Sequence, residues 1–195
     1  GMQLALLGAN IIKIEPPSGG DQMRNRVLGS QFSDIGMAAA FLGMNIGKRS
    51  LGLDIKSEKG KEILFALIKK SDVILHNFRA GVVDRLGLDY DSVRAINPSI
   101  VYTVISGFGA KGPRSADPAY DGAVQAAAGM MANNGTAESG PLRTGYMPVD
   151  LMTGMTAAYA TTAALLRKQK TGKGQMVDVA MLDCAITLGL SLIHI

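Results

Sequence analysis

Histidine, cysteine and tryptophan are nearly missing from this chain. Its 195 residues include one cysteine, two histidines and no tryptophan. One cysteine and two histidines are too few ligands for a zinc site of the common Cys/His type, so we expect no metal centre. Cys184 has no partner for an internal disulfide, which suits a reducing cytoplasm. A Ser-His-Asp site would depend on His76, but an apolar, strand-like run is more typical of a core or strand-end histidine.

Charge and long apolar runs are also limited. The net charge of +4 is not gathered into a stripe, and only 5% of the residues are aromatic. Both features argue against a nucleic-acid partner. No apolar run approaches the ~20 residues of a membrane span, and no basic cluster precedes an apolar segment at the N-terminus. We therefore expect a cytoplasmic protein without a membrane partner, whose mild positive charge fits either a small polyanionic ligand or scattered surface lysines.

The order of the elements indicates an α/β fold. Short β-branched runs predict strands at 10–14, 50–53, 73–75 and 100–105, and helices are expected at 57–70 and 91–96. This alternation predicts an open, mostly parallel sheet with covering helices. Further along, we expect a helix at 120–131, a long helix at 150–168, a strand at 175–179 and a helix from 181. Apolar residues of the long helix lie on one stripe, the pattern of an amphipathic helix: Leu151, Met155, Tyr159, Thr162 and Leu166.

Both ends of the sequence look truncated. Residues 1–9 read as the last turns of a helix that ends at Gly8. Residues 190–195 are identical to a translation of the transposon end used in preparing sequencing libraries, so we expect a non-native tail that includes His194. Residues 1–189 are then interpreted as the N-terminal part of one larger domain.

A glycine-rich segment follows the strongest predicted strand. Residues 107–112 (GFGAKG) match the G-x-G-x-x-G pattern of dinucleotide-binding turns. That turn requires a helix to begin at once, but Pro113 follows and an extended loop is expected. A glycine-rich loop is therefore favoured, and a NAD-dependent oxidoreductase that uses Gly107, Gly109 and Gly112 is kept as an alternative.

Asp150 follows Pro148 and Val149 and opens the predicted long helix. Aspartate is a preferred N-cap residue, so a purely structural role is one interpretation. A carboxylate near the positive end of the helix dipole should also stay ionised and could act as a nucleophile. The residues alone favour the cap.

Six segments together resemble the family III coenzyme A transferases, which include formyl-CoA transferase and 2-methylacyl-CoA racemase relatives. The segments, in order, are 8–17 (GANIIKIEPP), 45–54 (NIGKRSLGLD), 72–88 (DVILHNFRAGVVDRLGL), 97–112 (NPSIVYTVISGFGAKG), 150–154 (DLMTG) and 171–183 (TGKGQMVDVAMLD). The resemblance implies a Rossmann-like half of an interlocked-dimer fold.

The resemblance also implies roles for individual residues. The catalytic carboxylate of the family matches Asp150. Coenzyme A contacts carry over to Leu53, Lys56, Asn77, Phe78, Arg79, Arg85, Ala119, Tyr120 and Asp121. Pro16 stands where one family member has an arginine, so the ligand contact of that arginine does not carry over to this chain. Racemases of the family have a catalytic histidine where this chain has Tyr120, so the resemblance favours transfer over racemisation.

The implied activity is transfer of coenzyme A between an acyl-CoA thioester and a carboxylic acid through an aspartyl-CoA intermediate. Coenzyme A would act as substrate and carrier without a metal, and the full-length parent would be a homodimer. Two alternatives are the oxidoreductase above and a coenzyme A-binding fragment without turnover. We expect the 195-residue fragment alone to be inactive.

Overall fold

The computed structural model describes residues 1–24 and 35–190. The chain forms two compact units, residues 1–67 and residues 68–195. Among the described residues, no helix has the length and apolar character needed to cross a membrane. The predicted non-native tail falls, apart from Leu190, outside the described residues.

The first unit is built on two parallel strands. Its elements are α1 (Met2–Leu6), β1 (Ile11–Glu15), the 3-10 helix η1 (Gln22–Arg24), α2 (Ala39–Asn45), β2 (Lys48–Gly52) and most of α3 (Glu58–Lys69). Strand β1 pairs in parallel with β2, with Ile11 opposite Lys48. The hydroxyl of Ser57 accepts the N–H of Gly60 at 3.1 Å and so caps the start of α3.

Glu15 organises the loop that follows β1. Its side chain is only 3% exposed. It accepts hydrogen bonds from Arg24 Nε at 2.8 Å, Ser50 Oγ at 2.7 Å and the Asp21 N–H at 2.9 Å. These partners, the Arg24 hydrogen bond above all, lower the pKa of Glu15 to about 2. The guanidinium of Arg24 also lies 3.9 Å from the centre of the Phe41 ring, so one buried carboxylate joins β1, β2, η1 and α2.

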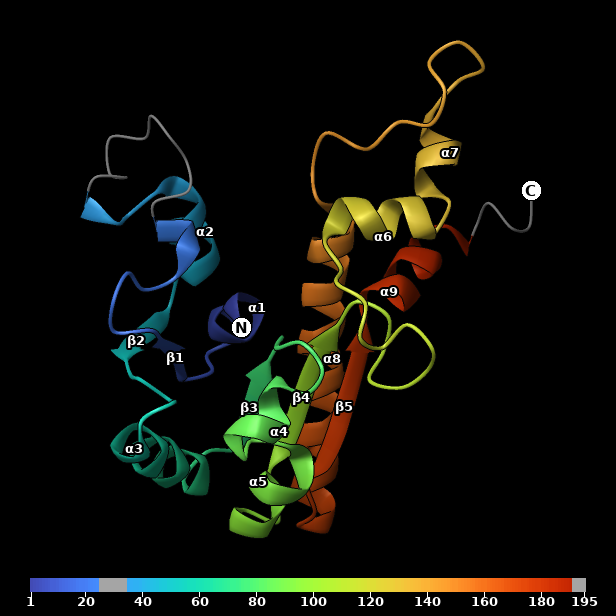
Figure 1. Cartoon of the computed structure of the whole chain (residues 1–195). Helices are drawn as coiled ribbons and strands as arrows, with labels where there is room; N and C mark the ends of the chain where they lie inside the picture. Colours follow the sequence, from blue (N-terminus) through green and yellow to red (C-terminus); the bar gives the residue numbers. More distant parts are fainter. Residues whose placement is uncertain (25–34, 191–195) are drawn as a thin grey trace. The chain divides into compact units, whose positions relative to one another are not determined.

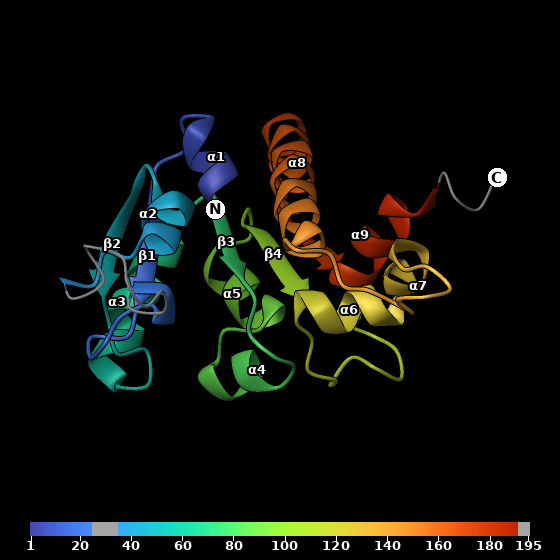
Figure 2. The ribbon, with the colours of Figure 1, turned by 90° about the horizontal axis from the view of Figure 1, so that it is seen from above.

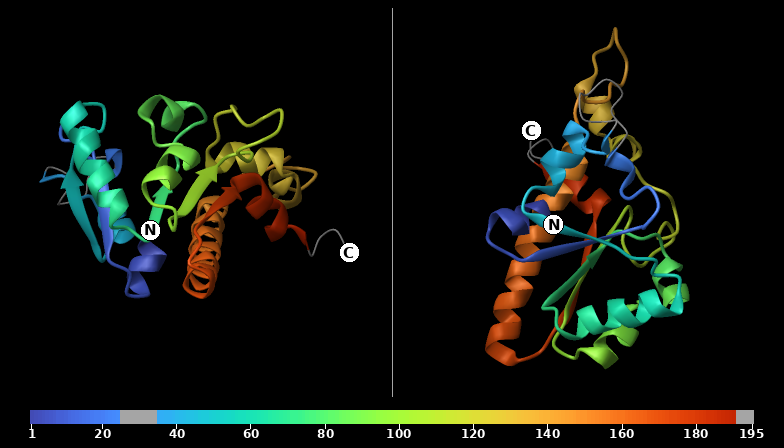
Figure 3. Two further views of the ribbon diagram at one scale, coloured as in Figure 1. Left: turned by 90° about the horizontal axis from the view of Figure 1, so that it is seen from below. Right: turned by 90° about the vertical axis from the view of Figure 1, so that its left-hand side faces the viewer.

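The second unit contains a three-stranded parallel sheet. Its strands are β3 (Val73–His76), β4 (Val101–Ser106) and β5 (Gln175–Ala180), in the order β3-β4-β5. Its helices are α4 (Val82–Leu86), α5 (Tyr90–Ile96), α6 (Asp121–Ala127), α7 (Met130–Asn134), α8 (Pro148–Thr171) and α9 (Met181–Leu188). Helix α8 covers one face of this sheet, and α4 and α5 lie on the other (Figures 2 and 3).

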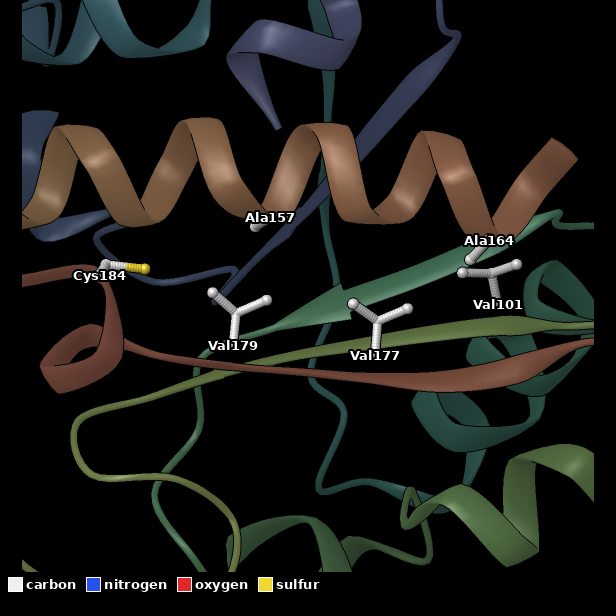
Figure 4. Packing of buried hydrophobic residues seen from close by; sticks show 6 residues of the cluster. All are labelled: Val101, Ala157, Ala164, Val177, Val179 and Cys184. Carbon is white, nitrogen blue, oxygen red and sulfur yellow. The ribbon is translucent and has the colours of Figure 1, made fainter. Parts of the chain in front are cut away.

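Helix α8 packs on the sheet through small side chains. Val101, Val177 and Val179 rise from the strands and meet Ala157 and Ala164 of the helix (Figure 4). The small alanines let the helix approach the β-branched residues closely. Buried hydroxyls of Thr103 and Thr161 satisfy each other at 2.8 Å.

The apolar stripe predicted on the long helix does not mark this buried face. Leu151, Met155, Tyr159 and Leu166 expose 59%, 57%, 66% and 53% of their surface. Small residues cover the sheet instead, which a count of large apolar side chains overlooks.

The predicted α/β architecture with parallel strands and covering helices is confirmed, with differences in detail. The strands fall into two sheets rather than one. The helix predicted at 120–131 is divided into α6 and α7 because Gly129 adopts a φ of 77°. The long helix begins at Pro148, two residues before its predicted start.

Candidate active site

The expected functional residues of the second unit gather at the carboxyl edge of its sheet. Residues 77–81 follow β3, and residues 107–120 follow β4. Gly172, with a φ of 69°, ends α8, and the chain then continues into β5. Helix α8 therefore runs opposite to the strands, and its first turn lies at the same edge as α6 (Figure 1). Ligands of open α/β sheets bind at this edge.

Asp150 is the third residue of α8 and its side chain is exposed. Pro148 occupies the first helical position, where its missing N–H costs nothing. The residue at the N-cap position is Met147, whose own side chain makes no capping hydrogen bond. The interpretation of Asp150 as the N-cap is therefore wrong, and its carboxylate is not used in capping its own helix.

Asp121, the first residue of α6, instead caps the start of α8. Its Oδ2 accepts the backbone N–H of Asp150 at 2.9 Å, one of the donors that a first helical turn leaves unpaired. Partial burial, and then the negative charge of Asp121, raise the pKa of Asp150. A carboxylate with a raised pKa is a better nucleophile as long as it remains ionised.

Gln125 links this pair to the segment that leads into α8. It is fully buried and donates from Nε2 to Asp121 Oδ1 and to Thr144 Oγ1. Its Oε1 accepts the Thr144 N–H at 3.1 Å, which fixes the orientation of the amide. Sequence reasoning missed Gln125; the available signal was its spacing of four residues from Asp121 on one helix.

Apolar packing holds α6 against the start of α8. Val124, Val149, Met181 and Ala185 form a buried cluster that joins α6, α8 and α9. The cluster fixes the distance between Asp121 and Asp150, because Val124 and Val149 are each close neighbours of these residues in the chain. The polar pair is thus held by rigid elements rather than by a free loop.

The loop after β3 carries three of the residues expected to contact coenzyme A. Asn77, Phe78 and Arg79 are all exposed, and Arg85 is exposed on α4. The Phe78 N–H donates to Nδ1 of His76 at 3.2 Å, so the last residue of β3 holds the turn. His76 is a strand-end residue, as predicted.

Ala119 and Tyr120 lie just before α6. Tyr120 is 70% exposed, whereas Asp121 is 6% exposed and uses both carboxylate oxygens within the protein. A Cβ at Gly107 would collide with the Cβ of Ala119, so the close approach of this loop requires glycine there.

The glycine motif is not followed by the helix that a dinucleotide turn needs. Gly109 and Gly112 have positive φ values of 92° and 106° within an irregular loop. The next helix, α6, begins only at Asp121. The geometry that would carry the oxidoreductase alternative is thus not formed at this loop.

Leu53 and Lys56 belong to the first unit. Leu53 is buried, and its N–H donates to the Glu15 carbonyl at 2.9 Å, just beyond the paired strands. The Lys56 side chain is exposed, and its N–H donates to Asp54 Oδ1 at 3.0 Å. Both residues lie in the turn between β2 and α3, with only the lysine side chain free to reach a ligand.

Comparison with known proteins points to one family. Residues 1–192 match the family described as CoA-transferase family III. The chain is 43% identical over 185 residues to a formyl-CoA:oxalate CoA-transferase of Streptomyces coelicolor, covering 95% of this chain and 44% of that protein. It is 36% identical over 188 residues to a succinate–glutarate CoA-transferase of Agrobacterium fabrum, covering 94% and 46%. The chain thus spans less than half of the length of these relatives.

Solved structures agree with this match. A CAIB/BAIF family protein from Brucella suis superposes with a TM-score of 0.91 at 36% identity, covering 100% of this chain and 51% of that one. A hypothetical protein from Mycobacterium tuberculosis superposes with a TM-score of 0.88 at 34% identity, covering 100% and 53%. The arrangement of strands and helices described above is therefore that of this group.

Proposed function

Because this chain belongs to CoA-transferase family III, we propose that the whole protein moves coenzyme A between an acyl-CoA thioester and a carboxylic acid, with Asp150 as the covalent carrier. The two relatives described above are CoA-transferases. The observation that carries the assignment is the exposed carboxylate of Asp150 at the carboxyl edge of the sheet: the backbone N–H of this residue is held by Asp121, and the pKa of its carboxyl is raised.

The first half of the reaction loads the enzyme. A carboxylate oxygen of Asp150 attacks the thioester carbonyl carbon, the C–S bond breaks, and the coenzyme A thiolate leaves with the electron pair. The product is a mixed anhydride between Asp150 and the acyl group. The thiolate then attacks Cγ of Asp150, which releases the first acid as its carboxylate and leaves an aspartyl-CoA thioester.

The second half reverses these steps with the acceptor acid. Its carboxylate attacks Cγ of the thioester and expels the coenzyme A thiolate, giving a second anhydride. The thiolate attacks the acceptor's acyl carbon, and Asp150 leaves as a carboxylate. No net proton transfer is needed, so these steps require no histidine as a general acid or base.

The residues of the carboxyl edge fit the remaining tasks. We assign coenzyme A binding to Asn77, Phe78, Arg79 and Arg85 after β3, and to Ala119, Tyr120 and Asp121 at the start of α6. In the first unit, we assign it to the side chain of Lys56 and the backbone of the buried Leu53. Arginine and lysine side chains suit phosphate groups, and the exposed rings of Phe78 and Tyr120 suit stacking. The resemblance to the family further implies an interlocked homodimer of the whole protein.

The names of the relatives guide the choice of acids. They include oxalate, succinate and glutarate, all dicarboxylic acids. We propose a small dicarboxylic acid as one of the two acids, and a panel of formyl-, acetyl- and succinyl-CoA with these acceptors tests it. Transfer only to monocarboxylic acids would refute this part of the proposal.

The covalent step is tested with Asp150→Ala in the full-length protein. We expect loss of transfer and loss of the coenzyme A adduct that mass spectrometry finds on the Asp150 peptide after incubation with acyl-CoA. Coenzyme A binding, measured by titration calorimetry, should be largely retained, and NAD should not bind. Near-normal turnover in the variant would overturn the assignment.

Asp91→Ala is the matched control. Asp91 is also an exposed aspartate in the first turn of a helix, but it lies on α5, which covers a face of the sheet. The control variant should keep full activity. Equal loss of activity in both variants would point to damage to the fold rather than to removal of the nucleophile.

A further inference from the structure

A chain of hydrogen bonds at the end of β3 has only one possible direction. Tyr102 donates its hydroxyl proton to the Leu88 carbonyl at 2.7 Å, because a carbonyl can only accept. Burial, together with the negative charges of Asp89 and Asp84, raises the pKa of Tyr102 to about 12, so the phenol keeps that proton. Nε2 of His76, 2.7 Å from the same hydroxyl, must therefore be the donor in that contact.

This direction fixes the tautomer of His76. A neutral imidazole carries one proton, and that proton is on Nε2, so Nδ1 is a free acceptor. The N–H of Phe78 donates to this nitrogen at 3.2 Å. Burial lowers the pKa of His76 to about 4, which keeps the ring neutral at physiological pH.

The same ring also supports the Phe78 side chain. The His76 and Phe78 rings are stacked with centroids 5.6 Å apart, and Tyr102 packs edge-on to His76 at 5.2 Å. On the other side, the Leu88 N–H donates to the Val83 carbonyl of α4 at 2.9 Å. One half-buried histidine thus ties the exposed turn after β3 to β4 and to the end of α4.

We infer that His76 is a positioning residue for coenzyme A. Its unprotonated Nδ1 holds the turn of Asn77, Phe78 and Arg79 in the conformation that binds the ligand. The inference rests on the proposed function, which places coenzyme A on these three residues. Because His76 acts through the turn that follows it, its effect should appear in binding and not in the covalent steps at Asp150.

Two substitutions test the roles of the two imidazole nitrogens of His76 separately. In His76→Asn, the side-chain oxygen occupies the place of Nδ1 and can still accept the Phe78 N–H, but the side chain no longer reaches Tyr102. In His76→Gln, the terminal amide can still donate to Tyr102, but no acceptor remains for Phe78. The two variants are similar in polarity and size and serve as controls for each other.

The experiment measures coenzyme A affinity by calorimetry and kcat and KM for acyl-CoA with the full-length protein. We expect His76→Gln to raise the Kd and KM about tenfold with little change in kcat, as for one lost hydrogen bond. His76→Asn should stay within about twofold of the wild type. Amide hydrogen exchange of Phe78 gives a second readout without ligand: protected in the wild type and in His76→Asn, fast in His76→Gln.

The outcomes are distinct. Equal weakening by both variants, or no change in either, would overturn the positioning role. Protection of the Phe78 amide in His76→Gln would do the same. Failure of the wild-type protein to bind coenzyme A at all would instead refute the proposed function, and this inference with it.

Discussion

The Asp121 carboxylate accepts the backbone N–H of Asp150 at 2.9 Å, so one acidic residue holds the main chain of another. The contact satisfies an otherwise unpaired donor of α8. Partial burial, and then the charge of Asp121, raise the pKa of the Asp150 carboxyl. One side chain from a different helix therefore helps to set both the position and the pKa of the candidate nucleophile. Asp121 thereby has a defined structural task besides any contact with coenzyme A.

Asp121→Asn should separate charge from position. Removing the negative charge lowers the pKa of Asp150, so the acid limb of the pH–rate profile should move to lower pH. The asparagine oxygen can still accept the Asp150 N–H, but its amide then faces the Gln125 amide, donor against donor. We expect kcat/KM to fall on the order of tenfold at neutral pH. A pH–rate profile with an unmoved acid limb would show that Asp121 does not tune Asp150.

Gln125→Glu should make stability depend on pH. In its protonated form, the new carboxyl can donate to Asp121 and accept from Thr144, much as Gln125 does. Once ionised, it is a second buried carboxylate beside Asp121, so its pKa in the folded protein is raised above the unfolded value. The variant should therefore be stable at acidic pH and lose on the order of 3 kcal/mol as pH rises through this pKa.

Denaturant unfolding at pH 5 and pH 8 measures this difference. Gln125→Met, which has similar volume and no charge, is the control, and its destabilisation relative to the wild type should not change between the two pH values. A pH-independent loss in Gln125→Glu would mean that Asp121 and residue 125 do not share one buried site.

The sequence allowed the parallel α/β arrangement to be predicted because β-branched runs and glycine breaks are local signals. It also singled out Asp150, but the interpretation of Asp150 as an N-cap failed because the helix starts at Pro148, a residue type that favours the first helical position. The capping group lies 29 residues away in Asp121. The exposed stripe that includes Leu151 and Tyr159 could not be placed from local sequence either. The face of α8 that packs on the sheet is decided by the fit of Ala157 and Ala164 to valines from distant strands.

The fold should lose stability in mild acid partly through His76. Its folded pKa of about 4 lies below the ordinary histidine value of 6.5, so the neutral form is favoured by folding. This contribution is complete above pH 6.5 and is lost as pH falls toward 4. Because the ring is partly exposed, we expect roughly 1 kcal/mol of difference between pH 7 and pH 5. His76→Asn, unfolded in parallel, should lack this component; an identical pH dependence in both proteins would assign the loss to other groups.

Gly107→Ala should disturb the site from a distance. A Cβ at position 107 would collide with the Cβ of Ala119, which precedes Tyr120 and Asp121 at the start of α6. The loop must shift, at a cost of about 1–3 kcal/mol for overpacking, and it carries Asp121 away from Asp150. We expect lower stability and a lower kcat, measured by denaturant unfolding and steady-state transfer assays.

Ala119→Gly supplies the rescue for this substitution. The double variant Gly107→Ala/Ala119→Gly removes the colliding methyl group while it keeps the new one, so the clash is relieved from the opposite side. If close packing is the only reason for glycine at position 107, the double variant should regain most of the lost activity, and the two substitutions should be strongly non-additive. Ala119→Gly alone should cost little, because it removes one partly buried methyl group. An unrescued double variant would mean that Gly107 meets the ligand through its own backbone, which would move the coenzyme A site toward the loop after β4.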